Sequence, residues 1–405
     1  MKIPLSKPYW GKEEERAVLS ALKNTSGAGD GPWSKKLSES LKLLTGSKYV
    51  YPVTSCTAGL ELAMSVLGAG AGDEVILPSF TMTSTANCIV VKGAKPVFAE
   101  IRGDTYNIDP DSVRRLINKK TKGIIIVHYA GMPVDLEEII TLAKRNKLFL
   151  VEDAAHAIGA KLGGKMLGTF GDIGVYSFHG TKNISCGEGG AVVTDSRLLA
   201  GKIEIYRAHG TNRNKFLAGL VDKYSWVGEG SSYFLSDLLA SIICAQLTKF
   251  DRIIAKRSRI AKEYAKALLG YRSLVNLPVI PQGTSANWHI YAIRFLNPKH
   301  RDIFIAKMRR KGIEVSSHYM PLHNSLMGQK LHDHGRDLSI TDMVSRSLVR
   351  LPIYPGLTRK QLDYIINSAK KILTEFRTVL SDSPLGSPPI ESGPPQGCCV
   401  VTPLG

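Results

Sequence analysis

Short apolar runs alternate with amphipathic stretches along the first 200 residues of the chain. The apolar runs predict buried strands, and they lie at 73–80, 95–101, 123–131, 148–157, 173–176 and 191–193. The amphipathic stretches predict helices, and they lie at 12–24, 35–45, 60–70, 83–93, 112–120 and 135–147. Continuous apolar strands separated by helices are typical of a parallel or mostly parallel sheet covered on both faces. The predicted fold class is therefore α/β.

The pattern changes after residue 200. A helix near 196–206 leads into a polar and aromatic stretch, and one long helix is predicted over 236–270. Beyond residue 285 we expect a smaller α+β unit, with strands at 288–295 and 313–319 and helices at 300–312 and 358–376. The predicted organisation is a large domain over 1–250, a small C-terminal domain over 251–378, and a Pro-, Gly- and Ser-rich disordered tail over 379–405.

Composition narrows the function classes. The chain has 405 residues, of which 43% are apolar and 22% charged, as in ordinary globular proteins. No apolar run approaches the roughly 20 residues of a membrane span, and no secretory signal is recognisable, so we expect a cytoplasmic protein with no membrane partner. The net charge of +18 is strong, but the basic residues are scattered and match no nucleic-acid-binding motif. None of the six cysteines forms a metal-type pair, so no metal site is predicted.

Three polar features beside apolar runs are candidates for chemistry. Hydroxyls and a glycine at 54–59 precede an amphipathic helix, where free backbone N–H groups favour a bound phosphate; an ordinary helix cap has the same signature. Asp153 ends an apolar strand at the sheet edge where α/β proteins bind ligands; a cap of the next helix is the alternative. Lys182, in a polar loop between two apolar runs, is either a solvated charge or an amine held inward for chemistry.

In chain order, these three features match what pyridoxal 5'-phosphate requires. A lysine amine forms a Schiff base with this cofactor, a carboxylate keeps its ring nitrogen protonated, and a helix N-terminus holds its phosphate. Lys182, Asp153 and the helix start at 54–59 supply one group each. No phosphate-loop or dinucleotide-binding glycine motif supports a competing interpretation.

Longer stretches around these residues resemble a known family. They lie at 72–101, 127–139, 151–183 and 187–195. On these motifs the chain is similar, over roughly residues 3–375, to the sugar aminotransferases of the DegT/StrS type. The resemblance implies fold type I with a seven-stranded, mostly parallel sheet, pyridoxal phosphate as cofactor, and transaminase activity. It also implies a homodimer with its active sites at the subunit interface.

The resemblance assigns roles to single residues. Lys182 matches the catalytic Schiff-base lysine and Asp153 the partner of the pyridine nitrogen. The other positions that match cofactor contacts are Thr57, Ala58, Met82, His156 and Ser177. The residues expected on the substrate side are Arg213, His318, Tyr319 and His323. Solvation of Arg213 and a core position for Tyr319 are the alternatives for those two residues.

Two positions depart from the family pattern. Met82 stands where an aromatic ring usually stacks on the cofactor, so a thioether would face the ring instead. Phe234 stands where many relatives offer an Asn from the partner subunit to the phosphate.

Two stretches indicate the substrate. Residues 210–237 and 316–323 most resemble transaminases that convert TDP-4-oxo-6-deoxy-D-glucose to TDP-4-amino-4,6-dideoxy-D-galactose for surface polysaccharides, with L-glutamate as the expected donor. The alternatives are the gluco product and a 3-oxo sugar substrate. In a different class, the chain would be a non-catalytic, cofactor-binding regulator, which the intact Lys182 and Asp153 argue against.

Overall fold

The computed structural model describes residues 2–331 and 337–381. The predicted tail lies outside the described residues from position 382 onward. Helix α14 (Arg359–Ser381) runs three residues past the expected domain end at 378. It begins with the reciprocal bonds of a capping box, in which Thr358 N donates to Gln361 Oε1 and Gln361 N donates to Thr358 Oγ1.

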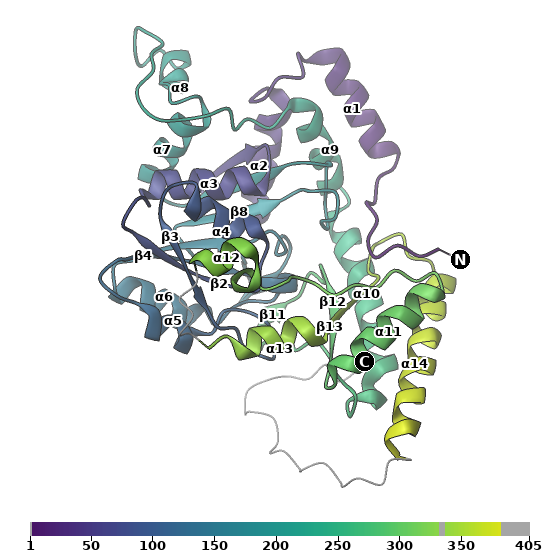
Figure 1. Cartoon of the computed structure of the whole chain (residues 1–405). Helices are drawn as coiled ribbons and strands as arrows, with labels where there is room; N and C mark the ends of the chain where they lie inside the picture. The colour runs from purple at the N-terminus through teal and green to yellow at the C-terminus, as the bar shows by residue number, and fades with distance from the viewer. Residues whose placement is uncertain (1, 332–336, 382–405) are drawn as a thin grey trace.

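A seven-stranded sheet forms the centre of the larger part of the molecule (Figure 1). Its strands, in spatial order, are β1 (Tyr49–Val53), β9 (Gly190–Thr194), β8 (Ile173–Ser177), β5 (Phe149–Asp153), β4 (Thr121–Val127), β2 (Glu74–Pro78) and β3 (Lys95–Ala99). Strand β9 pairs antiparallel with both of its neighbours, and the other neighbouring pairs are parallel. The predicted mostly parallel α/β sheet is confirmed.

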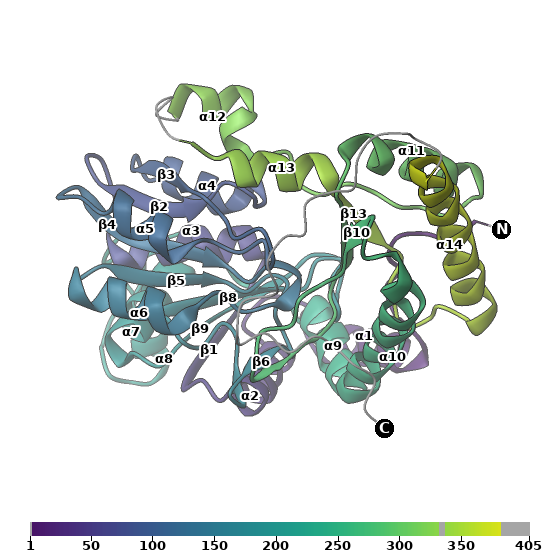
Figure 2. The same cartoon turned by 90° about the horizontal axis from the view of Figure 1, so that it is seen from below.

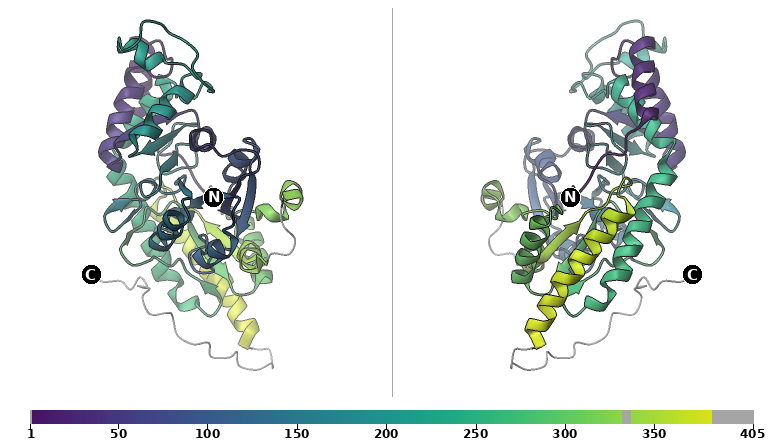
Figure 3. Two further views of the ribbon diagram at one scale, coloured as in Figure 1. Left: turned by 90° about the vertical axis from the view of Figure 1, so that its left-hand side faces the viewer. Right: turned by 90° about the vertical axis from the view of Figure 1, so that its right-hand side faces the viewer.

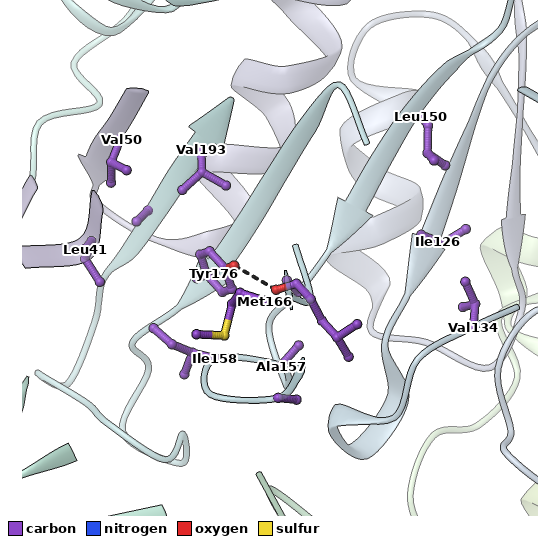
Figure 4. Close-up of a cluster of buried hydrophobic side chains, with 14 of the residues drawn as sticks. Leu41, Val50, Ile126, Val134, Leu150, Ala157, Ile158, Met166, Tyr176 and Val193 are labelled. Atoms are coloured by element: carbon purple, nitrogen blue, oxygen red, sulfur yellow. Dashed lines mark hydrogen bonds between the residues drawn. The ribbon is translucent and has the colours of Figure 1, made fainter. Parts of the chain in front are cut away.

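Helices cover both faces of this sheet (Figure 2). One face carries α2 (Pro32–Thr45), α5 (Pro110–Leu116), α6 (Leu136–Arg145) and α9 (Asp237–Leu247). The other face carries α3 (Cys56–Leu67), α4 (Thr83–Val90) and α7 (Arg197–Arg207). Side chains alternate between the two cores, since Ile124 and Ile126 of β4 pack into the first and Ile125 packs into the second. Figure 4 shows part of the first core, where the buried Tyr176 hydroxyl donates to the Leu167 carbonyl at 2.7 Å.

A second sheet and its helices form a separate apolar core in the C-terminal part (Figures 1 and 3). The sheet is antiparallel, in the order β10 (Val275–Asn276), β12 (Tyr291–Phe295) and β13 (Leu348–Leu351). The helices that pack on it are α10 (Phe250–Leu268), α11 (Pro298–Arg310) and α14. The N-terminal segment joins this core through the buried side chain of Ile3. Ala292 of β12 shares a smaller apolar cluster with Phe80 and Tyr129, so this second sheet lies beside the larger one.

The remaining elements are short or peripheral. A small sheet joins β6 (Lys161–Leu162), β7 (Lys165–Met166) and β11 (Thr284–Ser285). The other helices are α1 (Lys12–Asn24), α8 (Arg213–Leu217), α12 (Leu326–Leu331) and α13 (Ser339–Ser347), with 3-10 turns η1 (Tyr129–Gly131), η2 (Leu269–Tyr271) and η3 (Leu322–Asn324). Across the described ranges, no helix is long and apolar enough to cross a membrane.

Two predicted elements differ from the structure. The long helix expected over 236–270 is broken at Thr248 and Lys249 into α9 and α10. The break lets the buried Lys249 amine reach Glu14 Oε1 at 2.7 Å, an ion pair that links the two helices to α1. The segment 313–319 forms no continuous strand, because its bridges go to two different partners, Ile3 and Arg350.

Candidate active site

The carboxyl ends of the parallel strands open into a cavity of about 670 Å³. Such an edge is the usual ligand site of open α/β sheets. The sequence-predicted residues that line the cavity are Thr57, Met82, Asp153, His156, Ser177, Lys182, His318 and Tyr319. Ala58 is the next residue after Thr57 in the first turn of α3. The structure therefore gathers nine of the eleven predicted residues at one place.

The start of α3 forms one end of the cavity. The Ser55 hydroxyl caps the helix by accepting from Ala58 N at 3.0 Å, and among the described residues the N–H groups of Cys56 and Thr57 have no acceptor. Gly190 passes beneath this turn, where a Cβ would lie 2.8 Å from the Cys56 nitrogen. Free N–H groups at a helix start are a suitable site for a phosphate.

Asp153 lies at the end of β5 with only 4% of its surface exposed. Its carboxylate accepts from Thr85 Oγ1 at 2.8 Å and from Ala155 N at 3.1 Å. In the part of the chain that the structure describes, no amine or guanidinium lies within ion-pair distance of it. Burial raises the pKa of the Asp153 carboxyl, so a cationic partner from a ligand would stabilise its charged form.

Lys182 lies in the loop between β8 and β9. This loop is closed on itself by hydrogen bonds from Lys182 N to the His179 carbonyl and from Gly180 N to the Gly187 carbonyl. Burial lowers the pKa of the Lys182 ammonium below its ordinary value, which favours the neutral, nucleophilic amine. The half-buried lysine faces the cavity rather than solvent.

A buried polar network behind Lys182 was not predicted. The Asn183 amide nitrogen donates to the Asn287 carbonyl at 3.0 Å, which leaves the amide oxygen facing His289 Nδ1, also at 3.0 Å. The Asn287 side chain in turn donates to the His156 carbonyl at 2.7 Å. The rings of His289 and His156 are 4.5 Å apart, and burial lowers the pKa of both far enough to keep them neutral. The loop that carries Lys182 is thus held in place through the side chain of the next residue, Asn183.

The opposite wall comes from the C-terminal part. His318 Nδ1 lies 2.7 Å from the Tyr129 hydroxyl, and its ring stacks on Tyr319 at 3.7 Å. Tyr319 OH lies 3.4 Å from His156 Nε2. Arg350 of β13 also lines this wall. Arg350 and His289 were missed because a single arginine inside a short apolar strand, or a single histidine just before one, carries no local sequence signal.

Two predicted substrate-side residues lie away from this cavity. His323 is buried against the larger sheet, with Nδ1 2.7 Å from Ser79 Oγ and Nε2 3.3 Å from Asp342 Oδ1, and it helps to hold the segment around η3 in place. Arg213 donates to Asp30 Oδ2 at 2.7 Å and faces the Phe234 ring. Both side chains are held by protein partners, which accounts for their positions outside the cavity.

Comparison with known proteins agrees with this geometry. The profile of the DegT/DnrJ/EryC1/StrS aminotransferase family matches residues 8–370. The chain is 36% identical over 383 residues to the uncharacterised protein MJ1066 of Methanocaldococcus jannaschii, a match that covers 93% of this chain and 98% of that protein. The chain therefore belongs to the DegT/DnrJ/EryC1/StrS aminotransferase family, and it is an aminotransferase.

Two solved structures extend the comparison. Spr1654 of Streptococcus pneumoniae in its PMP form is 26% identical, with 94% of this chain and 100% of that chain covered and a TM-score of 0.85; it has also been solved in a PLP form. PseC of Helicobacter pylori, an aminotransferase involved in the biosynthesis of pseudoaminic acid, is also 26% identical, with 93% and 100% covered and a TM-score of 0.85. The cofactor of this family is pyridoxal phosphate, and the free helix start, the buried Asp153 and the cavity-facing Lys182 fit it.

Proposed function

We propose that the chain transfers an amino group from L-glutamate to TDP-4-oxo-6-deoxy-D-glucose and forms TDP-4-amino-4,6-dideoxy-D-galactose for surface polysaccharides or other glycoconjugates. The observation that carries this proposal is the shared cavity, in which Lys182, Asp153 and the α3 start face the wall of His318 and Tyr319. The specific sugar rests on the resemblance of residues 210–237 and 316–323 to enzymes of that specificity.

Lys182 moves the proton in the proposed reaction. Bound pyridoxal phosphate supplies an electron sink for the carbon that loses this proton. The Lys182 Nζ atom, whose pKa burial lowers, takes the proton from the donor's α-carbon and later returns a proton on the sugar side. The face of the sugar that Lys182 protonates decides between an axial and an equatorial amine.

Other residues of the cavity would bind and orient the cofactor. The free N–H groups of Cys56 and Thr57 with Ser177 would hold the phosphate, and Asp153 would keep the pyridine nitrogen protonated. Met82, which lines the cavity and has about half of its surface exposed, would contact the ring through its thioether. The remaining cofactor contact proposed is His156.

The sugar would meet the wall formed by His318 and Tyr319. His318 is neutral because burial lowers its pKa, and its bond to Tyr129 OH fixes the orientation of the ring. The rings of His318 and Tyr319 present an uncharged aromatic surface, which suits a deoxy sugar because such a sugar presents a methyl group and few hydroxyls.

We also propose that the chain acts as a homodimer. The segment around α8 projects from the body of the molecule (Figure 1) and exposes apolar side chains, including Trp226 at 80% and Leu220 at 74%. A second copy is a suitable cover for such a patch. Phe234, packed between Arg207 and Arg213, lies at the base of this segment. In such a dimer, Arg213 would approach the partner's site.

Two half-reactions test the proposed specificity. L-glutamate should convert the loaded enzyme to its pyridoxamine form, and TDP-4-oxo-6-deoxy-D-glucose should convert it back. The H4 coupling constants of the product, measured by NMR, should indicate an axial amine. Recovery only with 3-oxo or UDP-linked sugars would contradict the sugar assignment, and an equatorial amine would select the gluco product.

A further inference from the structure

Three helices lie side by side on the outer surface of the C-terminal part (Figure 3). Helix α14 packs against both α10 and α11. Arg359 of α14 lies 3.3 Å from Glu263 of α10, and Lys307 of α11 lies 2.5 Å from Glu375 of α14. The exposed sides of the three helices therefore adjoin and form one continuous surface.

Cations predominate on this surface, although the basic residues are scattered along the sequence. Outside the buried Arg257, the lysines and arginines of α10, α11 and α14 outnumber the aspartates and glutamates by fifteen to five. We use the name basic face for six exposed cations of α10 and α14 that have no ion-pair partner. They are Arg259, Lys262, Lys266, Lys360, Lys370 and Lys371.

The carboxylates of the three helices are mostly neutralised by other cations. Their ion pairs join Arg359 to Glu263 and Asp363, Lys307 to Glu375, and Arg301 to Asp302. Within the described ranges, no carboxylate lies within ion-pair distance of a basic-face side chain. Arg259, Lys262 and Lys266 follow one another at spacings of three and four residues, at which like charges on a helix repel. An anion from outside the chain would relieve this repulsion.

The dimensions of the basic face favour an extended partner over a small anion. On α14, the distance along the helix axis from Lys360 to Lys371 is about 17 Å, at 1.5 Å per residue. The neighbouring helix α10 adds a further width of about 8–10 Å. Both lengths match or exceed the electrostatic screening length of about 8 Å at physiological ionic strength. A single bound phosphate would therefore leave most of these charges unneutralised, whereas a broad anionic surface would face all of them.

Exposed aliphatic side chains distinguish a lipid surface from a nucleic acid. Leu269 follows the end of α10, Leu296 precedes α11, and Ile303 lies on α11, and all three are exposed. Aliphatic side chains beside lysines suit the boundary between lipid headgroups and acyl chains. Single-stranded nucleic acids stack on exposed aromatic rings, and in the described part of α10, α11 and α14 no aromatic ring is exposed.

We propose that the basic face docks the enzyme on the surface of an anionic phospholipid bilayer. Such a peripheral contact needs no membrane-spanning helix, and it is independent of the sugar that the enzyme uses. The basic face lies at the opposite end of the molecule from the α8 segment (Figure 1). A dimer formed through that segment would leave the basic face open to the bilayer.

The test measures binding of the full-length, cofactor-loaded enzyme to sucrose-loaded vesicles by sedimentation. Vesicles that mix phosphatidylglycerol with phosphatidylcholine are compared with vesicles of phosphatidylcholine alone. One triple variant combines Arg259→Gln, Lys262→Gln and Lys266→Gln and removes half of the basic face. The matched control combines Lys119→Gln, Lys120→Gln and Lys122→Gln, which removes the same charge from exposed lysines around the start of β4 in the larger part.

The parent should bind the vesicles that contain phosphatidylglycerol and not those of phosphatidylcholine alone. Binding should be lost in about 1 M salt, where the screening length falls to about 3 Å. Each lysine or arginine close to an anionic membrane strengthens binding by about fivefold, so the α10 triple variant should bind about 100-fold more weakly. The control should bind as the parent does, and both triple variants should keep the parent's rate with L-glutamate because their substitutions lie outside the cavity.

Three results would overturn the proposal. The first is no sedimentation of the parent with phosphatidylglycerol vesicles at low salt. The second is an equal loss of binding in the two triple variants, which would indicate attraction by net charge alone. The third is binding of a short DNA duplex, measured by fluorescence anisotropy, at enzyme concentrations that give no vesicle binding, which would assign the basic face to a nucleic acid.

Discussion

Asp153→Asn is the substitution that isolates charge from shape at the cofactor site. The Asp153 carboxylate accepts from Ala155 N through one oxygen and from Thr85 Oγ1 through the other. An Asn can keep its oxygen on Ala155 N and turn its amide nitrogen towards Thr85, whose hydroxyl lies 2.8 Å from Thr81 Oγ1 and can donate there instead. Both local hydrogen bonds therefore survive, and only the negative charge is lost.

The magnitude follows from what the lost charge would bind. A hydrogen bond to a charged group contributes about 1.5–3 kcal/mol, so Asp153→Asn should weaken pyridoxal phosphate binding by about 10- to 150-fold. The glutamate half-reaction should slow further, because a neutral ring nitrogen is a poorer electron sink.

The apo-enzyme should respond in the opposite direction. Burial raises the folded-state pKa of Asp153 above its ordinary value. The charged carboxylate therefore destabilises the fold at neutral pH, and this destabilisation disappears when the pH falls below the ordinary pKa of an aspartate. Apo Asp153→Asn should therefore have a higher free energy of unfolding than the parent at pH 7, and the difference should shrink as the solution is acidified.

Absorbance titration of the apo-enzyme with pyridoxal phosphate and urea unfolding at several pH values provide the two measurements. Asp195→Asn, an exposed aspartate whose Oδ1 accepts from Lys48 N, is the matched control and should behave as the parent does. Equal cofactor affinity and equal half-reaction rates in parent and Asp153→Asn would refute the reasoning.

Three further substitutions test other parts of the account. Lys182→Ala should abolish both half-reactions while leaving the far-ultraviolet circular dichroism unchanged; residual turnover would exclude Lys182 as the proton carrier. Asn183→Ala should lower the free energy of unfolding by about 1–3 kcal/mol in urea, because it leaves the buried His289 Nδ1 without its acceptor. Lys249→Met should lower the free energy of unfolding by about 3–5 kcal/mol, because the substitution leaves the Glu14 carboxylate buried without its cation. An unchanged free energy of unfolding would contradict the importance of that ion pair.

Local sequence patterns were sufficient for most of the larger sheet. Its strands are short and apolar throughout, since both faces are covered, and their polar ends mark the edge where Asp153 and Ser177 lie. The break at Lys249 was not predictable from periodicity, because it depends on the distant Glu14. The strand expected over 313–319 is not continuous in the structure, because its formation depends likewise on which partners are adjacent in space.

In the candidate site, too, some residues could be predicted from the local sequence and others depend on distant contacts. The residues at strand ends and at the α3 start could be predicted, since their position along the chain already places them at the sheet edge. Arg350 belongs to β13 of a different sheet, and His289 lies just before β12 of that sheet, so both reach the cavity only through the packing of the C-terminal part against the larger one. His323 was placed on the substrate side by resemblance, but its bonds to Ser79 and Asp342 hold it elsewhere.

The central claim is that the Lys182 amine carries the cofactor. Borohydride reduction of the pyridoxal phosphate-loaded enzyme, followed by proteolysis and mass spectrometry, locates the lysine to which the cofactor is covalently attached. We expect a single modified peptide with the phosphopyridoxyl group on Lys182, and no labelling in Lys182→Ala. Attachment to a different lysine, or equal labelling of Lys182→Ala, would contradict it.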